Sequence, residues 1–146
     1  MVFRKILAIL IGVMVFGTSL TASVYAETTS LSVDIGVSPL YEIAKTVKSN
    51  LSISGTTAYC TSSASGTEAV SITVEQTLQK QGLLWSWSGV KDASWEKTVN
   101  SNTISFSNTK SGLSSGKYRL KSVFTLTDKN GEVETITVYS AEKTVS

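Results

Sequence analysis

The stretch YRLKSVFTLTDKNGEVETITVY, residues 118–139, decides the fold because it contains two alternating runs joined by a turn. Within it, the segment Asp128–Gly131 is typical of a type I turn followed by a glycine in the left-handed region, which forms a three-residue hairpin loop. Counting back from this loop places Phe124 opposite Ile136 on the core side. We therefore predict an antiparallel β-hairpin with one buried face and one solvent-facing side.

A register shifted by one residue would place apolar side chains of the second strand on the solvent-facing side. A two-residue Asn-Gly turn would shift the pairing by one residue and place Ile136 and Val138 beside Lys121, so we reject it. In the chosen register, Glu134 falls opposite Leu126 on the core side, and we expect it to escape at the sandwich end or to be turned outward by a bulge. The other predicted pairs are Ser122 with Val138 on the core side, and Lys121 with Tyr139, Val123 with Thr137 and Thr125 with Thr135 on the solvent side.

The segment just before this hairpin carries the sharpest structural motif. The spacing of Leu113, Gly116 and Tyr118 before a long alternating strand resembles the tyrosine corner of immunoglobulin-like and fibronectin-type sandwiches. There the tyrosine hydroxyl binds backbone a few residues upstream, so Tyr118 is expected to reach back towards Leu113. The alternative is an ordinary buried tyrosine that begins a strand.

The rest of the chain after Pro39 also alternates with period two. Ala58 and Cys60 share one face of an early run, and no helical stripe interrupts the pattern. The next run is expected to bury Val70, Ile72, Val74 and Leu78. We therefore predict an all-β fold, an immunoglobulin-like antiparallel β-sandwich of about seven strands over residues 39–146.

The N-terminal region predicts export. Residues 1–26 combine a basic head, an apolar run from Ile6 to Phe16 and a small polar region ending at Ala26, the order found in a helical signal peptide. Cleavage after Ala26 would release a secreted protein with no membrane contact, and residues 27–38 would form an N-terminal tether. An uncleaved anchor is the alternative, although the apolar run is shorter than the roughly 20 residues of a spanning helix.

Removal of the signal peptide also changes the charge. Loss of Arg4 and Lys5 lowers the basic count from 13 to 11, which equals the 11 acidic residues. A neutral domain has no long-range attraction for nucleic acid, so we expect no nucleic-acid partner.

The residue types in the chain limit which catalytic and metal-binding sites it can form. The chain has no histidine, which excludes the common catalytic triads and the usual zinc ligands. Cys60, the only cysteine, is predicted to be a small buried side chain. We expect no catalytic residue, metal or cofactor, and therefore a protein that is not an enzyme. A hydrolase that uses carboxylates alone is the least favoured alternative.

Two groups of side chains are candidates for binding. Trp85 and Trp87 are two residues apart, so on a strand they would point the same way and could stack on sugar rings or grip a partner, together with Trp95. Packing in the core is the alternative, and the neighbouring Leu83 and Leu84 suggest an exposed apolar edge. The second group is the predicted outer basic face Lys117, Arg119 and Lys121, which could meet an anionic polymer or remain a solvated strand face.

The runs Gln76–Lys80, Leu113–Leu120 and Glu134–Ser140, with the tryptophans between them, resemble a family of small secreted proteins of unknown function from Gram-positive, clostridial-type bacteria. The segment Gly82–Ser94 departs from that pattern. The resemblance implies an exported bacterial β-domain and no catalytic residue. The leading hypothesis is a secreted binding module for cell-wall or extracellular polysaccharide or for protein, and the alternative is a secreted bacteriocin-like toxin or effector.

Overall fold

The computed structural model describes residues 41–146. The predicted signal peptide (1–26) and tether (27–38) lie outside these residues. In chain order, the elements are β1 (Ala44–Ser54), β2 (Thr57–Gly66), β3 (Ala69–Gln81), the 3-10 turn η1 (Leu83–Trp85), β4 (Trp87–Val99), β5 (Thr103–Lys110), β6 (Gly116–Asp128), β7 (Val133–Tyr139) and β8 (Lys143–Val145).

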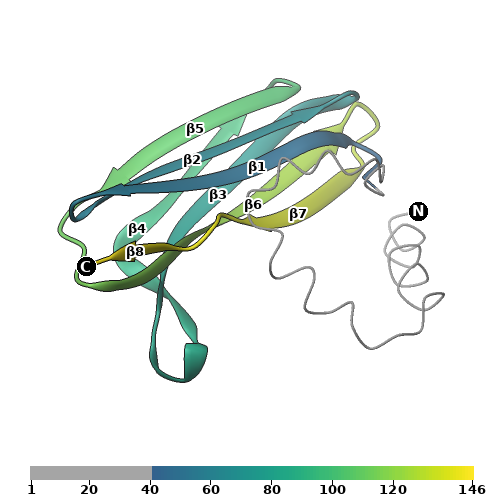
Figure 1. Ribbon diagram of the computed structural model, residues 1–146. Coiled ribbons are helices and arrows are strands. Elements are labelled where there is room, and N and C mark those ends of the chain that lie inside the picture. The colour runs from purple at the N-terminus through teal and green to yellow at the C-terminus, as the bar shows by residue number, and fades with distance from the viewer. Residues whose placement is uncertain (1–40) are drawn as a thin grey trace.

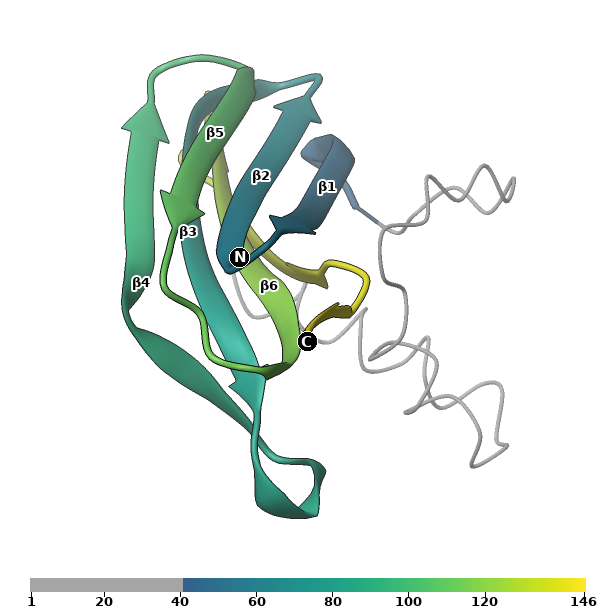
Figure 2. The same ribbon diagram turned by 60° about the vertical axis from the view of Figure 1, so that its left-hand side comes forward.

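The strands form two antiparallel sheets that face each other (Figures 1 and 2). One sheet has the order β1-β2-β5, and the other has the order β4-β3-β6-β7, with β8 also paired to β6. In a constant-type immunoglobulin domain, strands A, B, E and D form one sheet and strands C, F and G form the other. The sheets found here keep the A-B-E and C-F-G orders as β1-β2-β5 and β3-β6-β7, but β4 pairs with β3 and not with β5. The prediction of an immunoglobulin-like β-sandwich is confirmed.

The predicted hairpin register is also confirmed. Phe124 pairs with Ile136, and the other predicted pairs of β6 and β7 are all present. Gly131 has φ +80°, the left-handed conformation that the predicted loop requires. Its N–H donates to the Asp128 carbonyl at 3.1 Å, and the Asp128 N–H donates to the Glu132 carbonyl at 3.0 Å. Turn chemistry therefore fixes which face of β6 enters the core.

Glu134 keeps its predicted place opposite Leu126 and is half-buried at one end of the sandwich. Its carboxylate accepts hydrogen bonds from the backbone N–H groups of Glu42, Ile43 and Ala44, at 3.1, 3.1 and 2.8 Å. A charged side chain is stable at this position because it satisfies donors at the start of β1. The carboxylate thereby ties β1 of one sheet to β7 of the other.

The core between the sheets has two hydrophobic clusters with a polar layer among them. One cluster includes Phe124 and Ile136, and the other includes Tyr118 and Leu120. In the polar layer, the Ser122 hydroxyl lies 2.8 Å from that of Ser49 and 2.7 Å from that of Ser62. The layer continues through the fully buried Gln76, whose amide donates to Ser62 Oγ at 2.6 Å and to the Phe106 carbonyl at 3.0 Å.

Two expectations about the strands need correction. Val70 is exposed, because the β3–β6 register shifts between Ala69 and Ser71 and Ala69 takes the buried position instead. The structure also has a short additional strand, β8, which pairs with the first residues of β6. The sequence after Tyr139 gives little sign of it, because β8 is only three residues long.

Candidate functional site

The hairpin that joins β3 to β4 extends beyond the body of the sandwich and ends in η1 (Figures 1 and 2). Its loop is closed by local hydrogen bonds. The Gly82 N–H donates to the Ser86 carbonyl at 2.7 Å, and the Ser86 hydroxyl donates to the Leu83 carbonyl at 2.8 Å. This closed loop carries Leu83, Leu84 and Trp85, here called the hairpin tip, away from the body of the sandwich.

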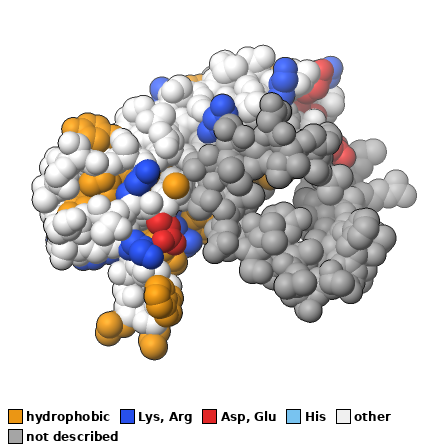
Figure 3. All heavy atoms as spheres, viewed as in Figure 1, with side chains coloured by type: hydrophobic (Ala, Val, Ile, Leu, Met, Phe, Trp, Pro, Cys, Tyr) orange, Lys and Arg blue, Asp and Glu red, His pale blue; other side chains and the backbone are white. Residues whose placement is uncertain are grey.

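The hairpin tip is highly exposed. Leu83, Leu84 and Trp85 are 89%, 95% and 76% exposed, respectively, and no other large hydrophobic side chain among residues 41–146 is as exposed as these. Hydrophobic side chains gather at the end of the protruding hairpin in Figure 3. Leu84 and Trp85 also adopt the left-handed backbone conformation, with φ +55° and +62°. Such a conformation costs a non-glycine residue about 1–2 kcal/mol, so the tip combines exposed apolar surface with backbone strain.

The three tryptophans occupy different environments. The expectation that Trp85 and Trp87 project from one strand is wrong, because Trp85 belongs to η1 and Trp87 begins β4. Trp87 is half-buried against neighbouring side chains. Trp95 packs against the core cluster that contains Tyr118 and Leu120, so the packing interpretation holds for Trp95. Of the three, only Trp85 is largely exposed.

The predicted basic face adjoins the tryptophans. The Arg119 guanidinium lies 4.3 Å from the Trp87 ring centre and 4.1 Å from that of Tyr139, and its Nε donates to Gln79 Oε1 at 2.8 Å. The contacts with two aromatic rings and the bond to Gln79 hold the guanidinium on the outer face of its sheet. Burial lowers the pKa of Arg119, while the charges of Tyr139 and Glu142 act to raise it.

The other two members of the basic face differ in their contacts. Lys117 Nζ lies 6.0 Å from the Trp85 ring centre and 3.2 Å from a carboxylate oxygen of Glu142. Lys121 is half-buried opposite Tyr139, one outward position further along β6. The basic face and two of the tryptophans therefore form one continuous surface that runs from the hairpin tip onto the sheet.

The predicted tyrosine corner involves Leu113, Gly116 and Tyr118. The buried Tyr118 donates its hydroxyl to the Ser114 carbonyl at 2.7 Å, and the N–H of the buried Leu113 donates to the Thr56 carbonyl at 3.0 Å. Gly116 has φ +143°, and a Cβ there would lie 2.6 Å from Lys80 Cε. The tyrosine corner is therefore present.

Cys60 is almost fully buried, as predicted. Burial raises the pKa of its thiol from 9.0 to about 12. A thiol in this environment remains protonated at neutral pH, so it is neither a strong nucleophile nor a ready metal ligand.

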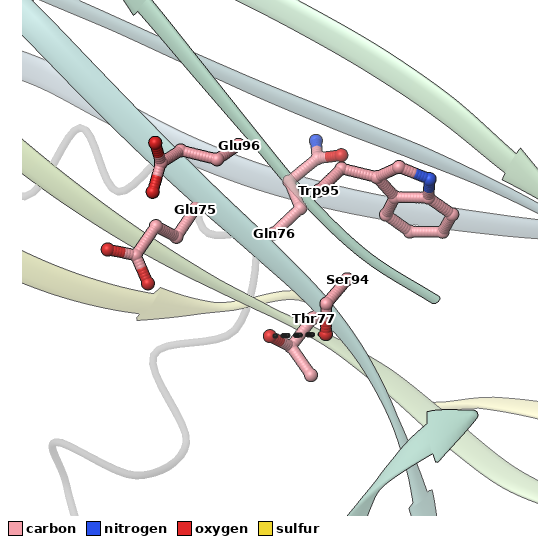
Figure 4. A pocket seen from close by; sticks show the side chains of 6 residues that line it. All are labelled: Glu75, Gln76, Thr77, Ser94, Trp95 and Glu96. Atoms are coloured by element: carbon pink, nitrogen blue, oxygen red, sulfur yellow. Dashed lines mark hydrogen bonds between the residues drawn. The ribbon is translucent and has the colours of Figure 1, made fainter. Parts of the chain in front are cut away.

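A shallow depression on the β3–β4 pair is lined by Glu75, Gln76, Thr77, Ser94, Trp95 and Glu96 (Figure 4). Glu75 and Glu96 are register partners, and both are exposed. Figure 4 shows the two carboxylates on one side of the ladder and Gln76 and Trp95 on the other. Sequence reasoning singled out no carboxylate pair, because this one depends on the pairing of β3 with β4.

Two other kinds of site, a metal centre and a membrane-spanning helix, are absent from residues 41–146. Within the described range 41–146, no three His, Cys, Asp or Glu side chains lie together so that they could hold a metal ion. In the same range, no helix has the length and apolar character needed to cross a bilayer.

Comparisons with known proteins show only distant likeness. No protein-family model and no curated protein matches this chain. Two crystal structures of wild-type OgpA from Akkermansia muciniphila match it with TM-scores of 0.38, at 13% and 12% sequence identity. The matches cover 73% and 70% of this chain but only 31% and 32% of OgpA. This chain therefore spans about a third of the length of OgpA, and the likeness is too weak to transfer a function.

Proposed function

We propose that this chain is a secreted, non-enzymatic binding module that contacts its partner through the hairpin tip. The observation that carries the proposal is the exposure of Leu83, Leu84 and Trp85 at consecutive positions of one loop. Single exposed hydrophobic side chains are common on soluble proteins, whereas a contiguous group of large ones marks an interaction surface.

The backbone of the tip supports the same interpretation. Leu84 and Trp85 take a left-handed conformation that glycine or asparagine would adopt at lower cost. The Leu84 and Trp85 side chains are 95% and 76% exposed, so they bury little surface in the core. Strained backbone is concentrated at functional sites. A role in binding a partner therefore accounts for both the strain and the exposed side chains.

The surface next to the tip can extend this contact. The Arg119 guanidinium contacts the rings of Trp87 and Tyr139, and Lys117 on the same strand lies 6.0 Å from the Trp85 ring centre. Aromatic and arginine side chains are the types most enriched in binding hot spots. The resemblance to exported bacterial β-domains supports a partner outside the cell, such as a cell-surface polymer or a protein.

Binding to whole Gram-positive cells and to purified cell walls tests the proposal. Protein lacking residues 1–26 is compared with the variant Leu83→Ser/Leu84→Ser/Trp85→Ser. A matched control, Val70→Ser/Val133→Ser, removes exposed hydrophobic side chains from other positions. We expect the tip variant to lose binding and the control to keep it. Equal binding by all three proteins, or binding by none of them, would contradict the proposal.

A further inference from the structure

The order of side chains at the hairpin tip matches the polarity gradient of a lipid bilayer surface. Leu84 and Leu83 are the most exposed, and Trp85 follows them. Leucine partitions into hydrocarbon, whereas tryptophan is enriched at the boundary between hydrocarbon and headgroups. A hairpin that stands clear of the sandwich can bring this group to a membrane without a collision of the domain with the lipid (Figure 1).

The backbone of the tip is suited to partial loss of water. Backbone polar groups that enter lipid need internal hydrogen-bond partners. The Leu83 carbonyl accepts from both the N–H and the hydroxyl of Ser86, and the Gly82 N–H has the Ser86 carbonyl as its acceptor. The loop therefore satisfies several of its own groups before it meets a partner.

Charge is distributed unevenly along the sandwich, and the basic end carries the tip. Strand register places the β3–β4 hairpin, the start of β6 and β8 at one end, and the β6–β7 loop at the other. The basic residues of the hairpin end are Lys80, Lys91, Lys110, Lys117, Arg119 and Lys143, and its acidic residues are Asp92 and Glu142. The opposite end has the acidic residues Glu42, Glu68, Asp128, Glu132 and Glu134, and the basic residues Lys45 and Lys129.

This polarity points to an anionic partner. In Figure 3, Lys and Arg side chains, with an acidic side chain beside them, lie at the base of the protruding hydrophobic hairpin. Basic side chains near a membrane surface are attracted to anionic lipid headgroups. The balanced net charge of the processed chain predicts no such attraction, but the local charge of the hairpin end is positive.

Other partners fit the tip less well. Leu83 and Leu84 are aliphatic and offer no flat face on which a sugar ring can stack. The Trp87 ring already contacts Arg119, so Trp85 is the single largely exposed aromatic side chain of the β3–β4 hairpin. We therefore propose, on the basis of the function proposed above, that the hairpin tip inserts into the surface of an anionic lipid bilayer. Leu83 and Leu84 enter the hydrocarbon boundary by about 5–10 Å, Trp85 lies among the headgroups, and Lys117 and Lys143 contact lipid phosphates. This proposal departs from the sequence-based expectation of no membrane contact after cleavage.

Vesicle binding tests the apolar part of the proposal. Vesicles of phosphatidylglycerol with phosphatidylcholine are compared with vesicles of phosphatidylcholine alone, using protein without residues 1–26. We expect binding to the anionic vesicles that Leu83→Ser/Leu84→Ser weakens at least about tenfold, which corresponds to about 1.4 kcal/mol. The control Val70→Ser/Val133→Ser should bind like wild type. Lipids brominated on their acyl chains should quench wild-type fluorescence more than that of Trp85→Phe.

A second set of variants tests the attraction of the basic side chains to anionic lipid. Lys117→Gln/Lys143→Gln should weaken binding to anionic vesicles and reduce its dependence on salt, whereas Lys45→Gln/Lys129→Gln, at the opposite end, should do neither. Circular dichroism confirms that each variant is folded. Absence of wild-type binding to anionic vesicles, or equal binding by the leucine variant, would overturn the lipid proposal. If the protein still bound whole cells or walls through the tip, the binding function would stand and only its lipid partner would be wrong.

Discussion

The Tyr118 hydroxyl donates a 2.7 Å hydrogen bond to the carbonyl of Ser114, four residues upstream, while the tyrosine ring is almost fully buried. This bond fixes the crossover from β5 to β6 and so sets where β6 begins. The position of β6 matters for the proposed site because Lys117 and Arg119 flank Tyr118 on that strand.

Replacement of Tyr118 by phenylalanine should lower the free energy of unfolding by about 1–3 kcal/mol, because the Ser114 carbonyl loses its donor. Urea or thermal unfolding measures the loss. Tyr59→Phe serves as the control, since Tyr59 is 47% exposed and should tolerate the change. Equal stability of Tyr118→Phe and wild type would show that the corner bond contributes nothing.

The polar layer of the core gives a second prediction. Ser122→Ala removes the hydroxyl that bonds to both Ser49 and Ser62. Ser49 keeps its bond to the Leu120 carbonyl, and Ser62 still accepts from Gln76, but the buried Ser62 O–H loses its acceptor. A buried donor without an acceptor destabilises the fold, so we expect a loss of about 1–3 kcal/mol in urea unfolding. Ser105→Ala, at an exposed position on β5, should change stability by less than about 0.5 kcal/mol. An undiminished unfolding midpoint for Ser122→Ala would contradict the network.

Cys60 predicts a pH dependence. The pKa of its thiol is about 12 in the folded protein, above its ordinary value of 9.0. The folded state therefore holds this proton more tightly than the unfolded state. Its contribution to stability is complete below pH 9 and is lost as the pH rises towards 12. Cys60→Ala should flatten the fall in unfolding free energy over that window, and native Cys60 should react slowly with thiol reagents at neutral pH. Rapid labelling would show that the thiol is accessible.

The strained tip predicts opposite effects on stability and binding. Leu84→Gly relieves a positive φ and should stabilise the fold by up to about 1 kcal/mol. The same change removes the most exposed side chain of the tip, so binding to its partner should weaken. Thermal unfolding and cell or vesicle binding measure the two effects. A large loss of stability would mean that the Leu84 side chain supports the fold.

The fold was largely predictable because its signals are local. The turn Asp128–Gly131 sets the register of β6 and β7, and the spacing of Leu113, Gly116 and Tyr118 predicts the corner. The role of Glu134 was not predictable, since its acceptor function depends on where β1 starts, some 90 residues away in the sequence. β8 also escaped prediction because a strand of three residues has too few positions to show alternation.

The candidate site was predictable only in its parts. Gly82 marks the end of the alternating run before the tip. Leucine and tryptophan rarely adopt a left-handed backbone conformation, so the local sequence does not distinguish η1 from a strand. The stacking of Arg119 on Trp87 depends on two strand pairings, β3 with β4 and β3 with β6. The sequence names Trp85, Trp87 and Arg119 as separate candidates, whereas their union into one surface arises from tertiary structure.

Tryptophan fluorescence of the free protein, compared with that of Trp85→Phe, tests most directly whether the hairpin tip is available to a partner. The difference between the two spectra isolates Trp85. The account predicts that this component is red-shifted and readily quenched by acrylamide, as expected for a side chain that is 76% exposed. A blue-shifted component that resists the quencher would mean that Trp85 is buried, and the hairpin tip could then not be the binding surface.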